Sequence, residues 1–392
     1  MNRYPENVKK IAEIFRENGY EAYAVGGCIR DMVMGRKPND WDMTTNCSPE
    51  KMLEIFKKVG IRTIPTGLKH GTVTVLLEKE AYECTTYRID GSYTDSRHPD
   101  KVTFTSLLSD DLCRRDFTVN AMAGDPLDSG DGIVDLYGGK IDIENKIIRA
   151  VGDPEKRFSE DALRILRAIR FATVLNFNID GQTKAAAVSL RNRLSDISAE
   201  RKTVEFQKIL LSPYADRGMS LLLETDIAKY IHPDLKKSPN ISLTSLKPSF
   251  TVRLAALFKD IPNLGCMKLS NEITKGVKLL CDSDLYNTCR NYFESDAANA
   301  RLLISKIGSF AEDAAILRND VTFAEIIKSE SENDPCVSLK QLDINGHDLL
   351  NSGIEARKLG AITQELLLKV IEDPELNKKE ALLSIALSIS KK

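Results

Sequence analysis

The chain has 392 residues, a formal net charge of −2, and 42% hydrophobic and 29% charged residues. This length favours more than one packed unit, the composition excludes a largely disordered chain, and the near-neutral charge provides no global basic field for nucleic acid. No apolar run reaches about 18 residues, which excludes a membrane span, and the eight scattered cysteines without a C-x-x-C pair favour a cytoplasmic protein with reduced thiols.

The first 150 residues predict a mixture of helices and strands. Apolar residues at helical spacing predict a helix over residues 1–20 that ends near Gly19. Two further helices are expected at residues 29–34 and 49–59. Alternating and β-branched residues predict strands at residues 21–25, 41–44, 72–77, 81–87 and 102–105.

Beyond about residue 155 the sequence predicts long helices interrupted by proline and glycine, with no strand after Asp180. The change of pattern places a boundary near residues 151–154. The polar, acidic residues 329–335 predict a loop. The sequence therefore predicts a small α/β head followed by helical parts.

The most informative motif is a Gly26-Gly27 turn followed by Arg30 and then by Asp40 and Asp42. Two carboxylates at positions i and i+2 of a strand point to the same side and can bind Mg²⁺ together. The glycine turn exposes backbone N–H groups to a triphosphate, and Arg30 can neutralise it. Without these neighbours, two acidic residues at a strand start would be an ordinary solvated hairpin.

Glu83 is a candidate third carboxylate, if its strand lies beside Asp40 and Asp42. The alternative is a surface glutamate paired with Arg88 or a lysine. In the next block, residues 111–121, adjacent arginines that include Arg115 suit a triphosphate, since guanidinium groups match phosphate oxygens. The polar residues that follow them could instead brace a helix.

In a third block, residues 157–170, charged residues recur at every third position from Asp161 onward. Most of the positions between them are apolar, which predicts a helix whose charged ridge is partly buried and needs anionic or planar partners. Asp161 accepts and Arg164 donates hydrogen bonds, so side by side on one helical turn they would form an adjacent acceptor and donor. The alternative is a helix-surface ion pair. The ridge is formed by Asp161, Arg164, Arg167 and Arg170.

Together the three blocks resemble those of the class II tRNA nucleotidyltransferases, the bacterial CCA-adding enzymes and their poly(A) polymerase relatives. The resemblance extends to Ser198–Glu205 and to later segments at residues 344–349 and 373–377. It implies an α+β fold: a small mixed α/β, polymerase-beta-like nucleotidyltransferase head, then an all-helical neck, body and tail. The implied divisions are a head at 1–150, a neck at 151–215, a body at 216–280 and a tail at 281–392.

The resemblance also implies roles for individual residues. Asp40 and Asp42 would bind the metal. Residues 91–99 resemble the loop that complete CCA-adding enzymes need for the final A. Many relatives carry an HD phosphohydrolase domain, but Lys259 stands where its histidine would be, so the body is expected to be degenerate and without that activity. Nucleotide contact would fall to Gly27, Arg30, Arg115, Asp161, Arg164, Arg167 and Arg170.

The expected function is template-independent addition of C, C and A to the tRNA 3′ end from CTP and ATP, with Mg²⁺ as cofactor and pyrophosphate as product. The helical parts would contact the acceptor stem and elbow of tRNA. One alternative is a poly(A) polymerase or an A-adding enzyme with the same head. A non-enzymatic alternative is a tRNA-binding or chaperone module, which the intact carboxylates and arginines disfavour.

Overall fold

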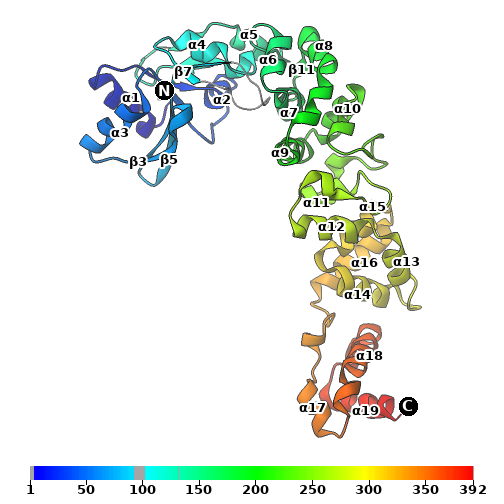
Figure 1. Ribbon diagram of the computed structural model, residues 1–392. Helices are drawn as coiled ribbons and strands as arrows, with labels where there is room; N and C mark the ends of the chain where they lie inside the picture. The colour runs from blue at the N-terminus through cyan, green and yellow to red at the C-terminus, as the bar shows by residue number, and fades with distance from the viewer. Residues whose placement is uncertain (1–3, 92–101, 131, 392) are drawn as a thin grey trace. The chain divides into compact units, whose positions relative to one another are not determined.

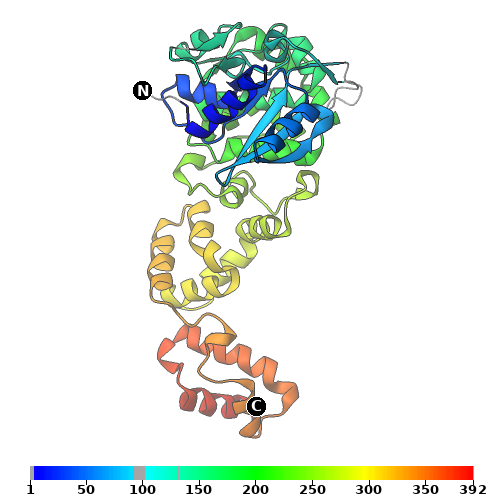
Figure 2. The same ribbon diagram turned by 90° about the vertical axis from the view of Figure 1, so that its left-hand side faces the viewer.

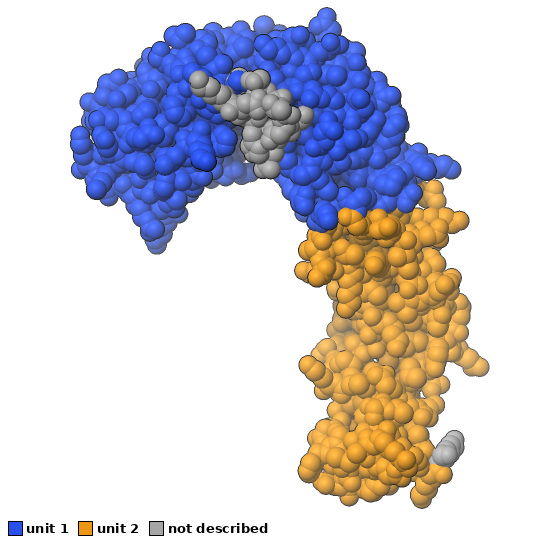
Figure 3. All heavy atoms as spheres, viewed as in Figure 1, with its two compact units in different colours: residues 1–238, 266–268 blue, residues 239–265, 269–392 orange. Residues whose placement is uncertain are grey.

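The computed structural model describes residues 4–91, 102–130 and 132–391. The chain divides into two compact units, coloured separately in Figure 3. Unit 1 contains residues 1–238 and 266–268, and unit 2 contains residues 239–265 and 269–392. Most of the loop expected from the resemblance at residues 91–99 lies outside the described residues.

The N-terminal part of unit 1 contains a mixed sheet in the order β3-β4-β5-β2-β1-β8-β9. Its strands β3 and β5 are labelled in Figure 1. Strands β2 and β5 pair in parallel, and the other neighbours are antiparallel. Met43, the first residue of β2, is opposite Cys84 of β5. The residues just before β2 therefore lie beside the middle of β5. The bounds are β1 Ala22–Val25, β2 Met43–Thr45, β3 Arg62–Gly67, β4 Thr72–Leu77, β5 Glu80–Thr86, β8 Met122–Gly124 and β9 Ile133–Asp135.

Helices α1 (Glu6–Glu17) and α3 (Pro49–Lys58) pack against the sheet and against each other. The rings of Phe15 and Phe56 meet edge to face at 5.2 Å and bury the apolar faces of both helices. Ser48 caps α3 by accepting from the backbone N–H of Lys51, with proline at the first helical position. The remaining elements of the head are α2 Gly27–Val33, β6 Arg88–Asp90, β7 Val102–Phe104, α4 Leu108–Cys113 and α5 Gly139–Glu144.

The rest of unit 1 is mainly helical, with a small parallel pair formed by β10 (Ile147–Ile148) and β11 (Asn178–Ile179). A Cβ on Gly218 would lie 2.5 Å from Ile209 and 2.7 Å from Thr173, so this glycine lets α10 pack closely on α7 and α9. The bounds are α6 Pro154–Glu160, α7 Leu163–Leu175, α8 Gly181–Ser189, α9 Ala199–Leu210 and α10 Ala215–Glu224.

In unit 2 the regular elements of the described residues are helices, joined by loops (Figure 2). Buried Arg301 joins three helices: it donates to the carbonyls of Ile371 and Glu372 at 2.8 and 3.1 Å and pairs with Glu330 at 2.7 Å. The bounds are α11 Phe250–Ala255, α12 Asn271–Cys281, α13 Ser283–Arg290, α14 Asp296–Ile307, α15 Ala311–Leu317, α16 Val321–Glu332, α17 Gly346–Asn351, α18 Leu359–Glu372 and α19 Lys379–Ser390.

The expected fold class, a small mixed head followed by helical parts, is confirmed. The strand expected at 72–77 coincides with β4. The loop expected at 329–335 was wrong in its first half, because α16 continues to Glu332. The edge strand β3 was missed because it is largely exposed and contains Pro65, so it lacks the alternation of a half-buried strand. Within the described part of the chain, no helix is long and apolar enough to cross a membrane.

Candidate active site

Asp42 directly precedes β2, which begins at Met43. Its carbonyl accepts a hydrogen bond from the N–H of Val25 at 2.9 Å, so the pairing with β1 continues for one residue beyond the strand. Asp40 lies two residues earlier, in the connection from α2. Both residues reach the surface, but the atoms packed around the Asp42 carboxylate remove part of its water. The strand expected at 41–44 therefore begins later than the sequence suggested, at Met43. Before Met43, only Asp42 still shares a backbone hydrogen bond with β1.

Glu83 lies beside Asp42 through the parallel pairing of β2 with β5. Since Met43 is opposite Cys84, the residues before them are neighbours on adjacent strands. The pKa of Asp42 is raised, first by loss of water around the carboxylate and then by the charges of Glu83 and Asp40, while Arg115 opposes the rise. Carboxylates that repel one another in this way are stabilised by a cation.

The geometry supplies only part of a metal's ligand set. Among the residues that the structure describes, no three His, Cys, Asp or Glu side chains are gathered closely enough to hold an ion by themselves. Asp40, Asp42 and Glu83 offer the oxygen ligands that hard divalent cations prefer, and a nucleotide's phosphates would complete the shell. The residues therefore fit a cation that binds together with substrate.

The Gly26-Gly27 turn connects β1 to α2 and requires glycine at its first position. Gly26 has φ +82°, and a Cβ there would lie 3.1 Å from Nη1 of Arg115. Gly27 opens α2, and a Cβ on it would lie 3.7 Å from Nη2 of Arg30. Only Gly26 therefore requires glycine, for its positive φ and for its close approach to Arg115. The sequence prediction singled out Gly27, whereas the backbone conformation that favours glycine lies at Gly26.

Arg30 is held by two partners from different segments. It donates to Asp31 through Nε and Nη2 at 2.9 and 2.7 Å, and to the side-chain oxygen of Asn120 at 2.8 Å. The amide of Asn120 donates in turn to Asp116 at 3.3 Å. Arg30 is therefore fixed by its neighbour on α2 and by the segment of the head that follows the arginine pair.

Asp111 was not singled out in the sequence, although it holds the arginine pair. It is fully buried and pairs with Arg114 at 2.7 Å and Arg115 at 3.1 Å, while the hydroxyl of Thr44 donates to it at 3.2 Å. Burial alone would raise its pKa, but the two arginines outweigh burial and lower it. The spacing of aspartate three and four residues before arginine was the available signal.

Asp116 connects the same block to α7. It is buried and accepts from the N–H of Phe117 at 2.9 Å and from Nε of Arg167 at 2.8 Å. Burial acts to raise its pKa, but Arg167, supported by Arg164 and Asn120, lowers it to about 2. Asp116 therefore remains ionised and fixes an arginine of the helical part against the head.

The continuous charged ridge expected over residues 161–170 was wrong at its start. Asp161 has an extended backbone between α6 and α7, and its carboxylate accepts from the N–H of Leu163 at 3.0 Å. A carboxylate in this position satisfies a free N–H group at the start of α7. Asp161 and Arg164 therefore do not lie on one helical turn.

The expected alternative, an Asp161–Arg164 ion pair, is also not what the structure forms. Asp161 pairs with Arg201 of α9 at 2.7 Å, whereas Arg164 pairs with Glu160 at 2.7 Å. Arg164 also donates to the carbonyls of Arg157 and Arg114 at 3.2 and 3.0 Å. The two side chains are thus held by different partners.

Arg167 and Arg170 do lie on α7, as expected, and Arg170 pairs with Glu205 of α9 at 2.6 Å. Both guanidiniums, with that of Arg30, lie near the ring of Phe171. The structure thus brings Arg30, Arg167 and Arg170 together. It places Gly27 and Arg115 at the turn before α2 and Asp161 and Arg164 at the start of α7.

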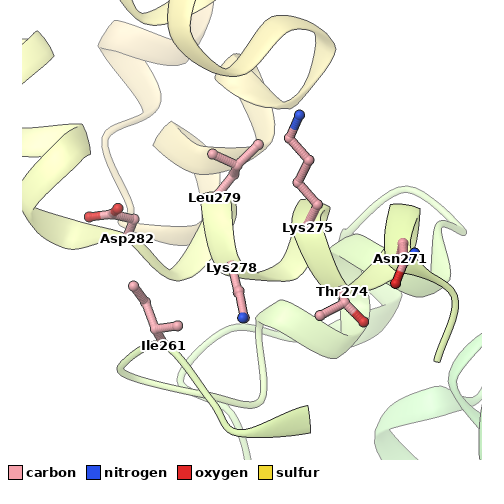
Figure 4. Close-up of a pocket in the computed structure, with 7 residues that line it drawn as sticks. All are labelled: Ile261, Asn271, Thr274, Lys275, Lys278, Leu279 and Asp282. Atoms are coloured by element: carbon pink, nitrogen blue, oxygen red, sulfur yellow. The ribbon is translucent and has the colours of Figure 1, made fainter. Parts of the chain in front are cut away.

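Unit 2 contains a separate open pocket of about 460 Å³ beside α12 (Figure 4). Lys278 points toward Ile261 in this view, whereas Lys275 points away from it. No carboxylate pair comparable to Asp40 and Asp42 lines the pocket, and its residues are not among those that the sequence singled out. The lining residues are Ile261, Asn271, Thr274, Lys275, Lys278, Leu279 and Asp282.

Two segments of the chain match known families. Residues 22–149 match the Poly A polymerase head domain, and residues 176–238 match the family described as the probable RNA and SrmB-binding site of polymerase A. With the carboxylates at the sheet and the arginines around the glycine turn, these matches define the class of the protein. It is a nucleotidyltransferase of the poly(A) polymerase type.

Relatives narrow the class to one family. The chain is 35% identical to the CCA-adding enzyme of Enterococcus faecalis over 98% of this chain and 97% of that protein, and 36% identical to that of Bacillus subtilis over 87% and 86%. It superposes with a TM-score of 0.82 on the Bacillus stearothermophilus CCA-adding enzyme in complex with CTP, at 28% identity over 100% and 98% of the two chains. The chain belongs to the CCA-adding enzyme family.

Proposed function

We propose that this protein adds C, C and A to the 3′ end of tRNA, using CTP and ATP and releasing pyrophosphate. The observation that carries the proposal is the similarity to CCA-adding enzymes along almost the whole chain, together with an intact carboxylate and arginine constellation. The tRNA 3′-hydroxyl forms a bond to the α-phosphorus, the bond to the β-phosphate oxygen breaks, and pyrophosphate leaves.

Asp40 and Asp42 are the proposed ligands of Mg²⁺, and Glu83 is a third carboxylate beside Asp42. When bound, the cation supplies Lewis-acid activation of the 3′-hydroxyl and neutralises charge on the phosphates. Asp42 and Glu83 offer oxygen ligands from neighbouring positions of adjacent strands, and Asp40 offers another from two residues before Asp42. No covalent intermediate on the protein is needed.

The proposed nucleotide site begins at the glycine turn. Gly27 is the first residue of α2, and the first turn of this helix would offer its backbone N–H groups to phosphate. The guanidinium of Arg115 lies next to Gly26 in the same turn. Arg30, Arg167 and Arg170 add guanidinium groups from α2 and α7.

Asp161 and Arg164 are the proposed readers of the base. Their partners, Arg201 and Glu160, fix an acceptor group and a donor group at the start of α7. The acceptor would receive the amino group of cytosine or adenine and the donor would bind the adjacent ring nitrogen, whereas uracil and guanine would present like groups.

We propose that residues 1–150 form the catalytic head, 151–215 the neck, 216–280 the body and 281–392 the tail, and that the helical parts bind the acceptor stem and elbow of tRNA. Recognition of A-form RNA by shape and phosphate contacts does not require a strongly basic chain. Arg301, which fixes α18 against α14 and α16, would keep the proposed tail surface rigid.

The test is transfer from each labelled nucleotide to a tRNA transcript without its CCA end, and to one ending in CC, in the presence of Mg²⁺. We expect two C residues and then one A. Long A tracts would indicate a poly(A) polymerase, A on the CC transcript alone would indicate an A-adding enzyme, and tRNA binding without transfer would indicate a binding module.

A further inference from the structure

Phe171 of α7 is the one aromatic ring that three of the proposed nucleotide-binding arginines share among the described residues. The guanidinium carbons of Arg170, Arg167 and Arg30 lie 3.8, 5.3 and 5.5 Å from its ring centroid. These distances fall within the roughly 6 Å range of cation–π contacts. Arg30 belongs to α2 of the head, whereas the other two lie on α7 with Phe171.

We propose that Phe171 is a positioning residue that gathers these three guanidiniums into one group that binds the nucleotide's triphosphate. The inference rests on the proposed function and goes beyond it by naming a residue that does not itself touch the substrate. It also assigns the three arginines to the phosphates, because a single base edge cannot occupy three clustered guanidiniums.

Three like charges in one place repel one another, and the structure shows this repulsion. Burial lowers the pKa of Arg170, and the charges of Arg167 and Arg30 lower it further, while Glu205 opposes them. Each arginine has an acidic partner of its own: Glu205 for Arg170, Asp116 for Arg167 and Asp31 for Arg30. The acids belong to three different segments, so the ring is the contact that the arginines have in common.

A ring holds an arginine in a way that suits phosphate binding. A carboxylate partner uses the guanidinium N–H groups that a phosphate would need, whereas an aromatic face attracts the cation without accepting those N–H groups in its plane. Nη1 of Arg167 has no acceptor among the described residues, and the side chain of Arg167 is 34% exposed, compared with 12% for Arg30 and 13% for Arg170. An anion would therefore reach the group from the side of Arg167.

The ring itself is fixed. Phe171 is 7% exposed, and it meets the fully buried ring of Phe117 edge to face at 5.7 Å and 74°. Phe117 directly follows Asp116, the partner of Arg167. The aromatic pair thus joins the head segment to α7 at the point where the three guanidiniums meet, and Phe171 cannot turn away without losing its buried contacts.

The test uses the full chain and three substitutions of Phe171. Phe171→Leu and Phe171→Met keep an apolar side chain but remove the aromatic ring, whereas Phe171→Tyr retains an aromatic ring. Phe56→Leu is the matched control, because Phe56 is also buried and also meets a second phenylalanine edge to face, but no arginine lies over it among the described residues. Circular dichroism and thermal unfolding establish that each variant is folded.

We expect Phe171→Leu and Phe171→Met to raise the Kd for pyrophosphate and for CTP about tenfold, as lost cation–π contacts of this kind predict. The Kd for cytidine should stay unchanged, the KM for CTP and ATP should rise together, and kcat should change by less than about threefold. Phe171→Tyr should restore pyrophosphate affinity. Phe56→Leu should reduce thermal stability without changing the affinity for pyrophosphate.

The inference is overturned if folded Phe171→Leu binds pyrophosphate within twofold of wild type, or if Phe56→Leu weakens that binding equally. It is also overturned if Phe171→Tyr behaves like Phe171→Leu. Failure of the proposed function has a different signature, in which wild type transfers no C or A to tRNA while the difference in pyrophosphate binding between wild type and Phe171→Leu persists.

Discussion

Replacing Asp116 by asparagine tests the connection between the head and α7. The substitution keeps the shape of the side chain but removes the charge that holds Arg167. The pKa of Asp116 lies near 2, compared with an ordinary value of 3.8, because the favourable contacts of the carboxylate with Arg167 and Asn120 exceed the opposing effect of burial. That difference corresponds to about 2 kcal/mol of stability at neutral pH.

The pH dependence follows from the direction of the shift. A carboxylate whose pKa is lowered on folding stabilises the protein above its unfolded pKa, and this contribution is lost as pH falls through the folded value. The stability difference between wild type and Asp116→Asn should therefore be about 2 kcal/mol at pH 7, and about half of it should be lost at pH 3. Comparing the two proteins at each pH removes the contribution of other carboxylates, such as Asp111.

Trp41 allows the measurement to be confined to unit 1, since it is the only tryptophan of the chain and its ring lies 5.6 Å from that of Tyr4, tilted by 58°. Urea unfolding followed by its fluorescence gives the free energy of unfolding at each pH. Glu54→Gln is the control, because the Glu54–Lys51 pair is exposed on α3 and should contribute nothing resolvable. If Asp116→Asn loses less than about 0.5 kcal/mol at pH 7, or loses equally at pH 3, the assignment of Asp116 as an ionised connector is refuted.

Asp42→Ala should reduce transfer of both C and A by several orders of magnitude at nearly unchanged tRNA affinity, because positioned metals contribute several kcal/mol. Quench-flow measures the transfer rate and filter binding measures the tRNA affinity. Activity above about a tenth of wild type would assign the metal to other carboxylates. Glu83→Ala should raise the Mg²⁺ concentration needed for the half-maximal rate, because an oxygen ligand beside the cation is lost, and an unchanged Mg²⁺ titration would make Glu83 a bystander. Asp161→Ala and Arg164→Ala should lose selectivity against UTP and GTP by one to two decades as well as rate, and strict rejection of both nucleotides by slow variants would show that the base is read elsewhere.

The sequence predicted the arrangement of the head well where local chemistry decides it. The glycine turn needs a residue that tolerates φ +82°, and the carboxylates follow it at a spacing that the strand pairing then brings beside Glu83. What the sequence did not show is which strands are neighbours. The order β5-β2-β1 in the sheet arises from long-range pairing, so Glu83 could only be a candidate until the register was known.

The break before α7 shows a different limit. Charges at every third residue fit a helix, and the apolar residues between them fit it equally well, so periodicity continued the helix through Asp161. The competing contact is local: Asp161 caps the N–H of Leu163, and aspartate is favoured at such positions. Its second partner, Arg201, lies 40 residues away on α9, at a separation that a helical pattern does not report.

The partners of Asp161 and Arg164 also bear on how a base could be read. In a flexible pair, each side chain would be free to turn and move its acceptor or donor atoms away from the base. Here Arg201 takes one carboxylate oxygen of Asp161 and the N–H of Leu163 takes the other, while Arg164 is held by Glu160 and two carbonyls. A carboxylate oxygen has two lone pairs and a guanidinium has five N–H groups, so both residues keep capacity for a ligand. Because their orientation is fixed before a nucleotide arrives, rejection of UTP and GTP would arise from unpaired groups rather than from rearrangement of the protein.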